Sequence, residues 1–486
     1  MIVKPLCLVF LATAVLCQPL HLAPKVNSKV DVNADTGANV NAVAKLKSTI
    51  EVNANKKSNV VIDARDKTNV AANAKDLSNL HIRGRVHSNV EANADSKSNT
   101  KIDAIHGSEA NTNARNSANL DVLSLDASRV SANADTKSST KIDANRESRV
   151  DANAKNGANL DVLSSEWSRV GANADTKSNT KIDANRASRV DANAKNGANL
   201  DVLSSKWSRV GANADTKSNT KIDANWVSRV DANAKNGANL DVLSSEWSRV
   251  GANADTKSNT KIDANRASRV DANAKNGANL DVLSSKWSRV GANADTKSNT
   301  KIDANWVSRV DANAKNGANL DVLSSEWSRV GANADTKSNT KIDANRASRV
   351  DANAKNGANL DVLSSKWSRV GANADTKSNT KIDANWVSRV DANAKNGANL
   401  DVLSSEWSRV GANADTKSST KIDANRASRV DANAKNGANL DVISNQISSV
   451  AANADRRSNS RVSANRRSRV GLNANRRANV NVVADN

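Results

Sequence analysis

Apolar and polar residues alternate along most of this chain in a frame of ten residues. Counting from Ser28, units such as SKVDVNADTG and SRVDANAKNG follow one another to Asn486 without insertion or deletion. Positions three, five and seven of a unit are apolar or small, as in Val150, Ala152 and Ala154, and positions two, four and six of that unit are polar. This period of two is typical of a half-buried β-strand. A repeat of ten does not fit the seams of packed helices, which follow about 3.5 to 3.67 residues.

Positions eight to ten of each unit carry turn residues, most clearly in Lys155-Asn156-Gly157. Odd and even units differ, because in the near-identical repeats odd units have Ala at position five where even units have Val or Ile. The structural repeat is therefore twenty residues. We predict an all-β fold, a two-sheet parallel β-solenoid whose 20-residue rungs each contain two ten-residue strand-turn units, with about 23 rungs. At about 4.8 Å per rung, the stack would be on the order of 110 Å long.

Charged residues follow the same register. Position four of even units alternates between Asp161, Lys181 and Asp201, so a parallel stack places opposite charges on neighbouring rungs, which stabilises it. From Arg129 to Arg429, position two of odd units instead carries Arg on every rung, which stacks like charge on like charge. Proline is absent after Pro24, as expected where each backbone N–H is needed for a ladder.

The ends of the chain differ from its middle. Residues 1–17 resemble a secretory signal peptide, with an apolar run over 6–16 and a cleavage site before Gln18. After it we predict an N-terminal lead-in or cap (18–27), diverged solenoid repeats (28–127), near-identical repeats (128–447) and Arg-rich C-terminal repeats or a cap (448–486). The diverged repeats still keep the frame, which indicates a physical cost for a slip. We expect the protein to be secreted and extracellular, without a membrane anchor.

Composition limits the chemistry that the chain can perform. Both cysteines lie in the predicted signal, and the formal net charge of +20 favours anionic partners. There is no Gly-rich phosphate loop, no Cys/His ligand set and no recurring Ser/His/Asp arrangement. An active site needs unlike groups that converge in a pocket, whereas a uniform stack repeats the same corner. We therefore predict a protein that is not an enzyme and that has no catalytic residue, no metal site and no cofactor.

Tryptophan is the only aromatic residue of the predicted mature chain, and every Trp falls at position nine or ten of an even unit. The sequence allows two interpretations, a packed corner in which rings shield backbone and stack on cations, or an exposed stripe that binds a regular polymer such as a polysaccharide. The candidate stripe consists of Trp167, Trp207, Trp226, Trp247, Trp287, Trp306, Trp327, Trp367, Trp386 and Trp407.

The arginines at position two of odd units form a second candidate surface. They can be a solvated charged face, or a column that binds a polyanion such as an acidic glycan. Nucleic acid is not an expected partner outside the cell, and this face itself carries no aromatic residue. The candidate column includes Arg149, Arg169, Arg189, Arg209 and Arg229.

The period and strand pattern resemble those of secreted β-solenoid repeat proteins in general, a class that includes structural, adhesive and ice-binding members. That resemblance and the tandem copies favour a non-enzymatic structural protein, a stiff rod for an extracellular matrix, silk, sheath or coat, with partners in self-association or in matrix components. A polysaccharide- or polyanion-binding rod is the first alternative. An ice-binding solenoid is the second, since columns of Asn such as Asn153 and Asn159 could order water, although Asp161 and Lys181 flank the Asn159 column.

Overall fold

A computed structural model describes residues 9–14, 20–22, 29–226, 228–266, 268–306, 308–346, 348–446 and 448–485. The predicted cleavage site and most of the predicted signal and lead-in lie outside these residues. Of that region only two short strands are described, and they pair in parallel with the first two repeat strands. The chain forms two compact units, Met1–Leu243 and Ser244–Asn486, which are described separately.

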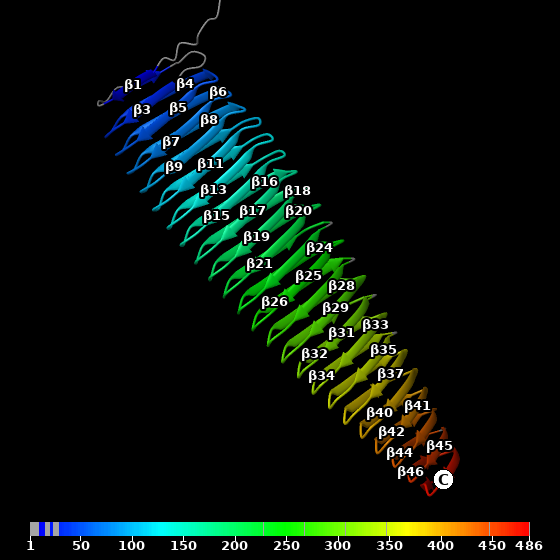
Figure 1. The fold of residues 1–486 in the computed structure, drawn as a ribbon. Coiled ribbons are helices and arrows are strands. Elements are labelled where there is room, and N and C mark those ends of the chain that lie inside the picture. The colour runs from blue at the N-terminus through cyan, green and yellow to red at the C-terminus, as the bar shows by residue number, and fades with distance from the viewer. Residues whose placement is uncertain are drawn as a thin grey trace, which may run out of the picture. The chain divides into compact units, whose positions relative to one another are not determined.

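All secondary structure in the described residues is β-strand (Figure 1). In the first unit the odd-numbered strands are β1 (Val9–Ala14), β3 (Lys29–Ala34), β5 (Thr49–Ala54), β7 (Asn69–Ala74), β9 (Asn89–Ala94), β11 (Glu109–Ala114), β13 (Arg129–Ala134), β15 (Arg149–Ala154), β17 (Arg169–Ala174), β19 (Arg189–Ala194), β21 (Arg209–Ala214) and β23 (Arg229–Ala234). The even-numbered strands are β2 (Leu20–Leu22), β4 (Asn39–Leu46), β6 (Asn59–Asp66), β8 (Asn79–Val86), β10 (Asn99–Ala104), β12 (Asn119–Ser124), β14 (Ser139–Ala144), β16 (Asn159–Glu166), β18 (Asn179–Arg186), β20 (Asn199–Lys206) and β22 (Asn219–Ala224).

The division between the units falls within β24 (Asn239–Glu246). In the second unit the odd-numbered strands are β25 (Arg249–Ala254), β27 (Arg269–Ala274), β29 (Ser288–Ala294), β31 (Ser308–Ala314), β33 (Ser328–Ala334), β35 (Arg349–Ala354), β37 (Ser368–Ala374), β39 (Ser388–Ala394), β41 (Ser408–Ala414), β43 (Arg429–Ala434), β45 (Ser449–Asp455) and β47 (Arg469–Asn475). The even-numbered strands are β26 (Asn259–Arg266), β28 (Asn279–Lys286), β30 (Asn299–Ala304), β32 (Asn319–Glu326), β34 (Asn339–Arg346), β36 (Asn359–Lys366), β38 (Asn379–Ala384), β40 (Asn399–Glu406), β42 (Ser419–Arg426), β44 (Asn439–Gln446), β46 (Asn459–Asn465) and β48 (Asn479–Asp485).

Within each unit, odd-numbered strands form one parallel sheet and even-numbered strands form the other. In the first sheet Val150 lies between Val130 and Val170, and in the second Val162 lies between Ile142 and Ile182. Each residue thus pairs with those twenty positions away. The predicted two-sheet parallel β-solenoid with 20-residue rungs is confirmed.

The interior lies between the two sheets and is thin. Positions one, three, five and seven point inward, so Val150, Ala152 and Ala154 are buried on the odd strand β15, and Leu160 and Val162 on the even strand β16. The side chains at positions two, four and six lie on the outer faces of the sheets. The alternation of the sequence is therefore the alternation of inside and outside along each strand.

The turns that follow odd strands are tight because two consecutive residues adopt left-handed backbone conformations. Asn156 has φ +54° and Gly157 has φ +79°, a conformation that Asn and Gly tolerate best. The alternative turn begins with Asp175, whose Oδ1 accepts a hydrogen bond from the backbone N–H of Thr176 at 2.8 Å. The hydroxyl of buried Ser178 donates to the carbonyl of Asp175 at 2.5 Å. This bond explains why a polar residue occupies the inward-facing position one.

The predicted charge columns are present. Asp161 pairs with Lys181, and Lys181 with Asp201, on neighbouring strands. An equivalent lysine, Lys141, has its pKa raised above the usual value by its hydrogen bond and charge interaction with Asp143 on its own strand, and further by the carboxylates of the neighbouring rungs. The columns therefore place each exposed cation among carboxylates, as expected for this register.

Candidate functional site

The tryptophans all lie at the corner where an even strand leads into the next odd strand, and we call this row the Trp corner. Between 51 and 67 % of each Trp is exposed to solvent. The seven at position ten, which include Trp167 and Trp207, are the more exposed, and the three at position nine, such as Trp226, are about half exposed. Such exposure favours the interpretation as a stripe over that of a packed corner, although a ligand on it stays a prediction.

The backbone at the corner explains why the rings project outward. Trp167 has φ +44° and Trp226 has φ +46°, in the left-handed region where a bulky residue is rare. The backbone N–H of Trp167 donates to the carbonyl of Arg186 on the next rung at 2.9 Å. The inter-strand ladder thus continues through this turn and holds its backbone, while the indole remains on the surface.

The Arg column runs along the odd sheet beside the corner, with each arginine at the start of its strand. Arg149, Arg169, Arg189, Arg209 and Arg229 are in register on successive strands, as predicted. Like charges are therefore directly adjacent, which is destabilising unless they are neutralised.

Only alternate members of the column have a carboxylate partner. Nε of Arg149 lies 3.1 Å from Oδ2 of Asp151, and Arg189 pairs with Asp191 in the same way. Arg169 has Gly171 where its neighbours have Asp, and no ion pair joins it to any residue in the described part of the chain. A Cβ on Gly171 would lie 3.1 Å from Oδ1 of Asp151, so a larger side chain here would crowd the carboxylate that pairs with Arg149.

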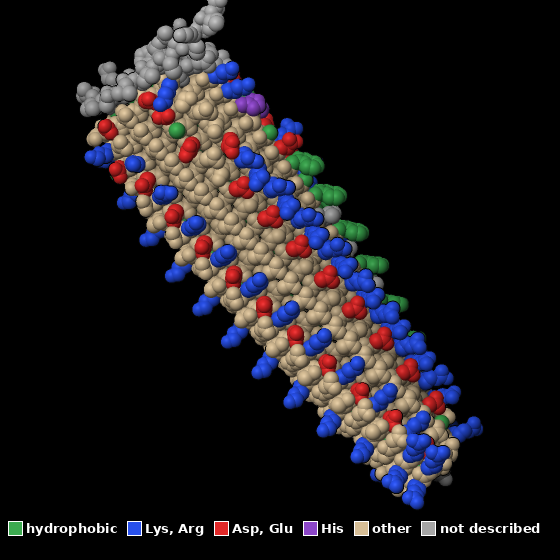
Figure 2. Space-filling view, in the orientation of Figure 1, with side chains coloured by type: hydrophobic (Ala, Val, Ile, Leu, Met, Phe, Trp, Pro, Cys, Tyr) green, Lys and Arg blue, Asp and Glu red, His purple; other side chains and the backbone are tan. Residues whose placement is uncertain are grey.

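The Trp corner and the Arg column, which the sequence suggests are two separate surfaces, line one groove in the second unit. This groove is shallow and open, and it is lined by Trp367 and Trp407 together with Arg369, Arg389 and Arg409, among others. Tryptophan and arginine meet because one buried serine alone separates them along the chain. Figure 2 shows hydrophobic side chains along one edge of the visible face, next to a row of Lys and Arg.

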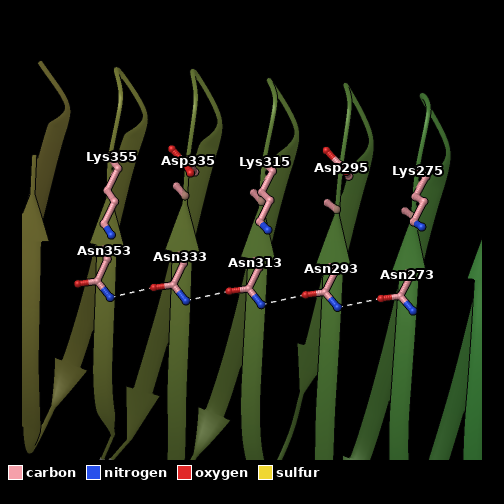
Figure 3. A pocket seen from close by; sticks show the side chains of 14 residues that line it. Asn273, Lys275, Asn293, Asp295, Asn313, Lys315, Asn333, Asp335, Asn353 and Lys355 are labelled. Atoms are coloured by element: carbon pink, nitrogen blue, oxygen red, sulfur yellow. Dashed lines mark hydrogen bonds between the residues drawn. The ribbon is translucent and has the colours of Figure 1, made fainter. Parts of the chain in front are cut away.

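The asparagine columns form side-chain ladders on both sheets, and on the even sheet Ser139 and Ser419 interrupt the column. In Figure 3 the amide Nδ2 of Asn313 donates to Oδ1 of Asn293 at 2.8 Å, and Asn313 Oδ1 accepts from Asn333 at the same distance. On the even sheet Asn319 and Asn339 continue an equivalent ladder at 2.9–3.0 Å. Each amide gives one N–H and its oxygen to its own column, so the ladders reinforce the stack.

Histidine and carboxylate residues do not assemble a metal centre in the part of the chain that the structure describes. His81 and His106 each contact a carboxylate instead, Asp103 at 3.1 Å and Asp126 at 3.0 Å. Within the same residues, no helix has the length and apolarity needed to cross a membrane.

The sequence identified the residues of this site but missed how they are combined. The missed signal is readable in the repeats: SRVG follows each Trp at position ten, and SRVD occupies the alternate odd units. Comparison of the chain with protein-family models, with curated proteins and with solved structures finds no match to any of the three.

Proposed function

We propose that this protein is a secreted, non-enzymatic structural element of an extracellular matrix, silk, sheath or coat. The observation that carries the proposal is the continuity of the bonding within each unit. Every rung is joined to the next by backbone ladders in both sheets, and Asn side-chain ladders add a further row of bonds on each outer face.

This bonding favours stiffness. A single hydrogen bond contributes only about 0.5–1.5 kcal/mol net, but bonds of two strands and two Asn columns must open together for adjacent rungs to separate. The stability of such a stack is a sum over neighbouring rungs, so added copies lengthen it without changing the contacts of any one rung. The identical copies 168–247, 248–327 and 328–407 suit a role in which length is the useful property.

Antibodies against the repeated 80-residue segment, applied to tissue that expresses the protein, test the proposal. We expect the label in an insoluble extracellular layer that releases the protein only in strong denaturant. The N-terminal sequence of the recovered protein should begin at Gln18. Label confined to the cell interior would refute the structural role and the predicted export together.

Binding to a polymer is the second candidate function, and the groove shared by Trp and Arg favours it. The two roles are compatible, because a stiff element of a matrix must also hold the other components of that matrix.

A further inference from the structure

We propose that, within each unit, the Trp corner and the Arg column together form a binding stripe for an acidic polysaccharide. The proposal rests on the proposed extracellular role in one respect, which is that the protein would meet such a polymer outside the cell. The stripe itself depends only on the side chains of this surface and on their spacing.

The repeating element of the stripe is the segment Trp-Ser-Arg-Val-Gly. It presents an exposed indole and, two residues later, an arginine whose strand carries Gly instead of the partner Asp. Among the described residues these arginines make no ion pair, while those on the alternate rungs do. The segment occurs seven times, at Trp167/Arg169, Trp207/Arg209, Trp247/Arg249, Trp287/Arg289, Trp327/Arg329, Trp367/Arg369 and Trp407/Arg409.

Charge on this side of the stack is strongly unbalanced. In the copy 168–247 the corner and the neighbouring column carry the cations Arg169, Arg186, Arg189, Lys206, Arg209 and Arg229 against the carboxylates Asp191, Asp231 and Glu246. The in-register arginines repel one another across about 4.8 Å. Anionic groups along the column would remove this repulsion, so the surface is complementary to a polymer with regularly spaced negative charges.

The tryptophans decide which polyanion fits. Their main spacing is two rungs, or about 9.6 Å. An extended polysaccharide also repeats its geometry at regular intervals, and the apolar face of a sugar ring packs well against an exposed aromatic ring. A row of rings beside a row of unpaired guanidinium groups therefore matches a polymer that offers sugar faces and carboxylate or sulfate groups together. Planar guanidinium suits both anions, because it can donate two parallel hydrogen bonds.

The groove in the second unit shows that the two kinds of side chain are close enough to act on one ligand. It runs past Trp367 and Trp407 and past the neighbouring arginines, and two of the seven unpaired arginines, Arg369 and Arg409, line it. A neutral glycan would use only the rings, and a polyanion without sugars would use only the arginines.

Binding is tested with the full secreted chain and four polymers. The probes are heparin, polygalacturonate, neutral dextran and polyglutamate, at physiological ionic strength. All ten tryptophans of the chain lie at this corner, so intrinsic fluorescence reports directly on the site. We expect a saturable fluorescence change with heparin or polygalacturonate, with the preferred polymer distinguishing a sulfate from a carboxylate ligand, and weaker binding of dextran and polyglutamate.

Two sets of substitutions and one matched control separate the contributions. Arg→Gln at the seven unpaired positions removes seven charges at the stripe. Lys→Gln at Lys177, Lys217, Lys257, Lys297, Lys337, Lys377 and Lys417 removes the same charge at the opposite corner. Trp→Asn at the seven position-ten sites removes the rings, and Asn tolerates the left-handed backbone found there. Circular dichroism checks that each variant is folded.

We expect the Arg→Gln and Trp→Asn variants each to lose about tenfold or more in affinity, because contacts along one polymer act together. The Lys→Gln control should change affinity by about twofold or less, since charges beyond a Debye length are screened. Equal losses in the control and the Arg→Gln variant, or unchanged binding in the Trp→Asn variant, would overturn the proposal in favour of general polyanion attraction. Absence of binding to both acidic polysaccharides would also overturn it, and would leave the proposed structural role untouched.

Discussion

Replacing Ile102 by Ala tests the central claim that stability is shared only between neighbouring rungs. Ile102 lies on β10, is fully buried, and pairs with Ile82 on β8 and Val122 on β12. Its position belongs to the diverged repeats, so peptides from this part of the chain have unique masses. The identical copies further along cannot be distinguished in this way.

The magnitude follows from what the substitution removes. Ile→Ala deletes buried methyl and methylene groups from a thin interior, and such changes cost about 2–5 kcal/mol. Because each 1.4 kcal/mol is about a tenfold change in an equilibrium constant, local opening of this rung should become about 30-fold to 3,000-fold more frequent. Only β8, β10 and β12 and the odd strands beside them share the lost contacts, so the effect should fade within a few rungs.

Hydrogen exchange followed by mass spectrometry measures this local opening directly. We expect faster exchange in peptides that cover β8, β10 and β12, and unchanged exchange in peptides from β3 to β5. Lys101→Ala, which alters the exposed neighbour of Ile102 on the same strand, is the matched control and should have little effect. Exchange that accelerates equally throughout the chain, or that does not change at β10, would refute the nearest-neighbour account.

Three further predictions concern the ladders, the turns and the outer faces. Asn93→Ala removes one bond to Asn73 and one from Asn113, at 2.9 and 2.8 Å, and should cost about 1–2 kcal/mol locally, which hydrogen exchange of β9 can measure. Burial disfavours ionisation of Asp255, but hydrogen bonds from the Asn276 side chain and from Thr256 outweigh it and lower its pKa below 3.8. The pKa of Asp415 is lowered in the same way. A carboxyl group with a lowered pKa stabilises the folded state at pH values above its unfolded-state pKa, and this stabilisation is lost as the pH falls through its folded-state pKa. Melting temperatures should therefore drop below about pH 3.8, and above that pH these two carboxyl groups should not change them. Because the Asn amides bond to one another, we expect no thermal hysteresis and no shaping of ice crystals at micromolar protein, and either effect would contradict this view of the Asn ladders.

Much of the fold was predictable because one frame constrains every rung. The inward positions of Val150 and Ala152, the Asn156-Gly157 turn and the Asp161–Lys181 column each follow from the sequence and are found in the structure. A single unit would be ambiguous on its own. The diverged repeats that keep the same phase make the interpretation firm, since a shift by one residue would turn every inward side chain outward.

The arrangement of the candidate site was less predictable. The turn at Trp167 has no Asn or Gly, so nothing in Glu166-Trp167-Ser168 signals a left-handed backbone or an exposed ring. The turn conformation instead depends on the ladder bond to the next rung, which is a tertiary contact. The alternation of Asp and Gly at position four predicts which arginines have a carboxylate partner. The distance between Arg149 Nε and Asp151 Oδ2 is what shows that the pair forms.

The same stacking that stabilises the asparagines is what exposes the arginines. A register of twenty residues places every side chain over its own counterpart, so an amide gains a partner on each side while a guanidinium gains a neighbour of like charge. Asp at position four of every odd unit would neutralise the Arg column, but it would also stack carboxylate on carboxylate. Gly171 relieves that crowding and leaves Arg169 unpaired. The unpaired charge is thus a consequence of the register, and it recurs beside each of the most exposed tryptophans. In a stack, one substitution per repeat becomes a linear array, and a linear array of rings and cations is suited to a polymer rather than to a small ligand.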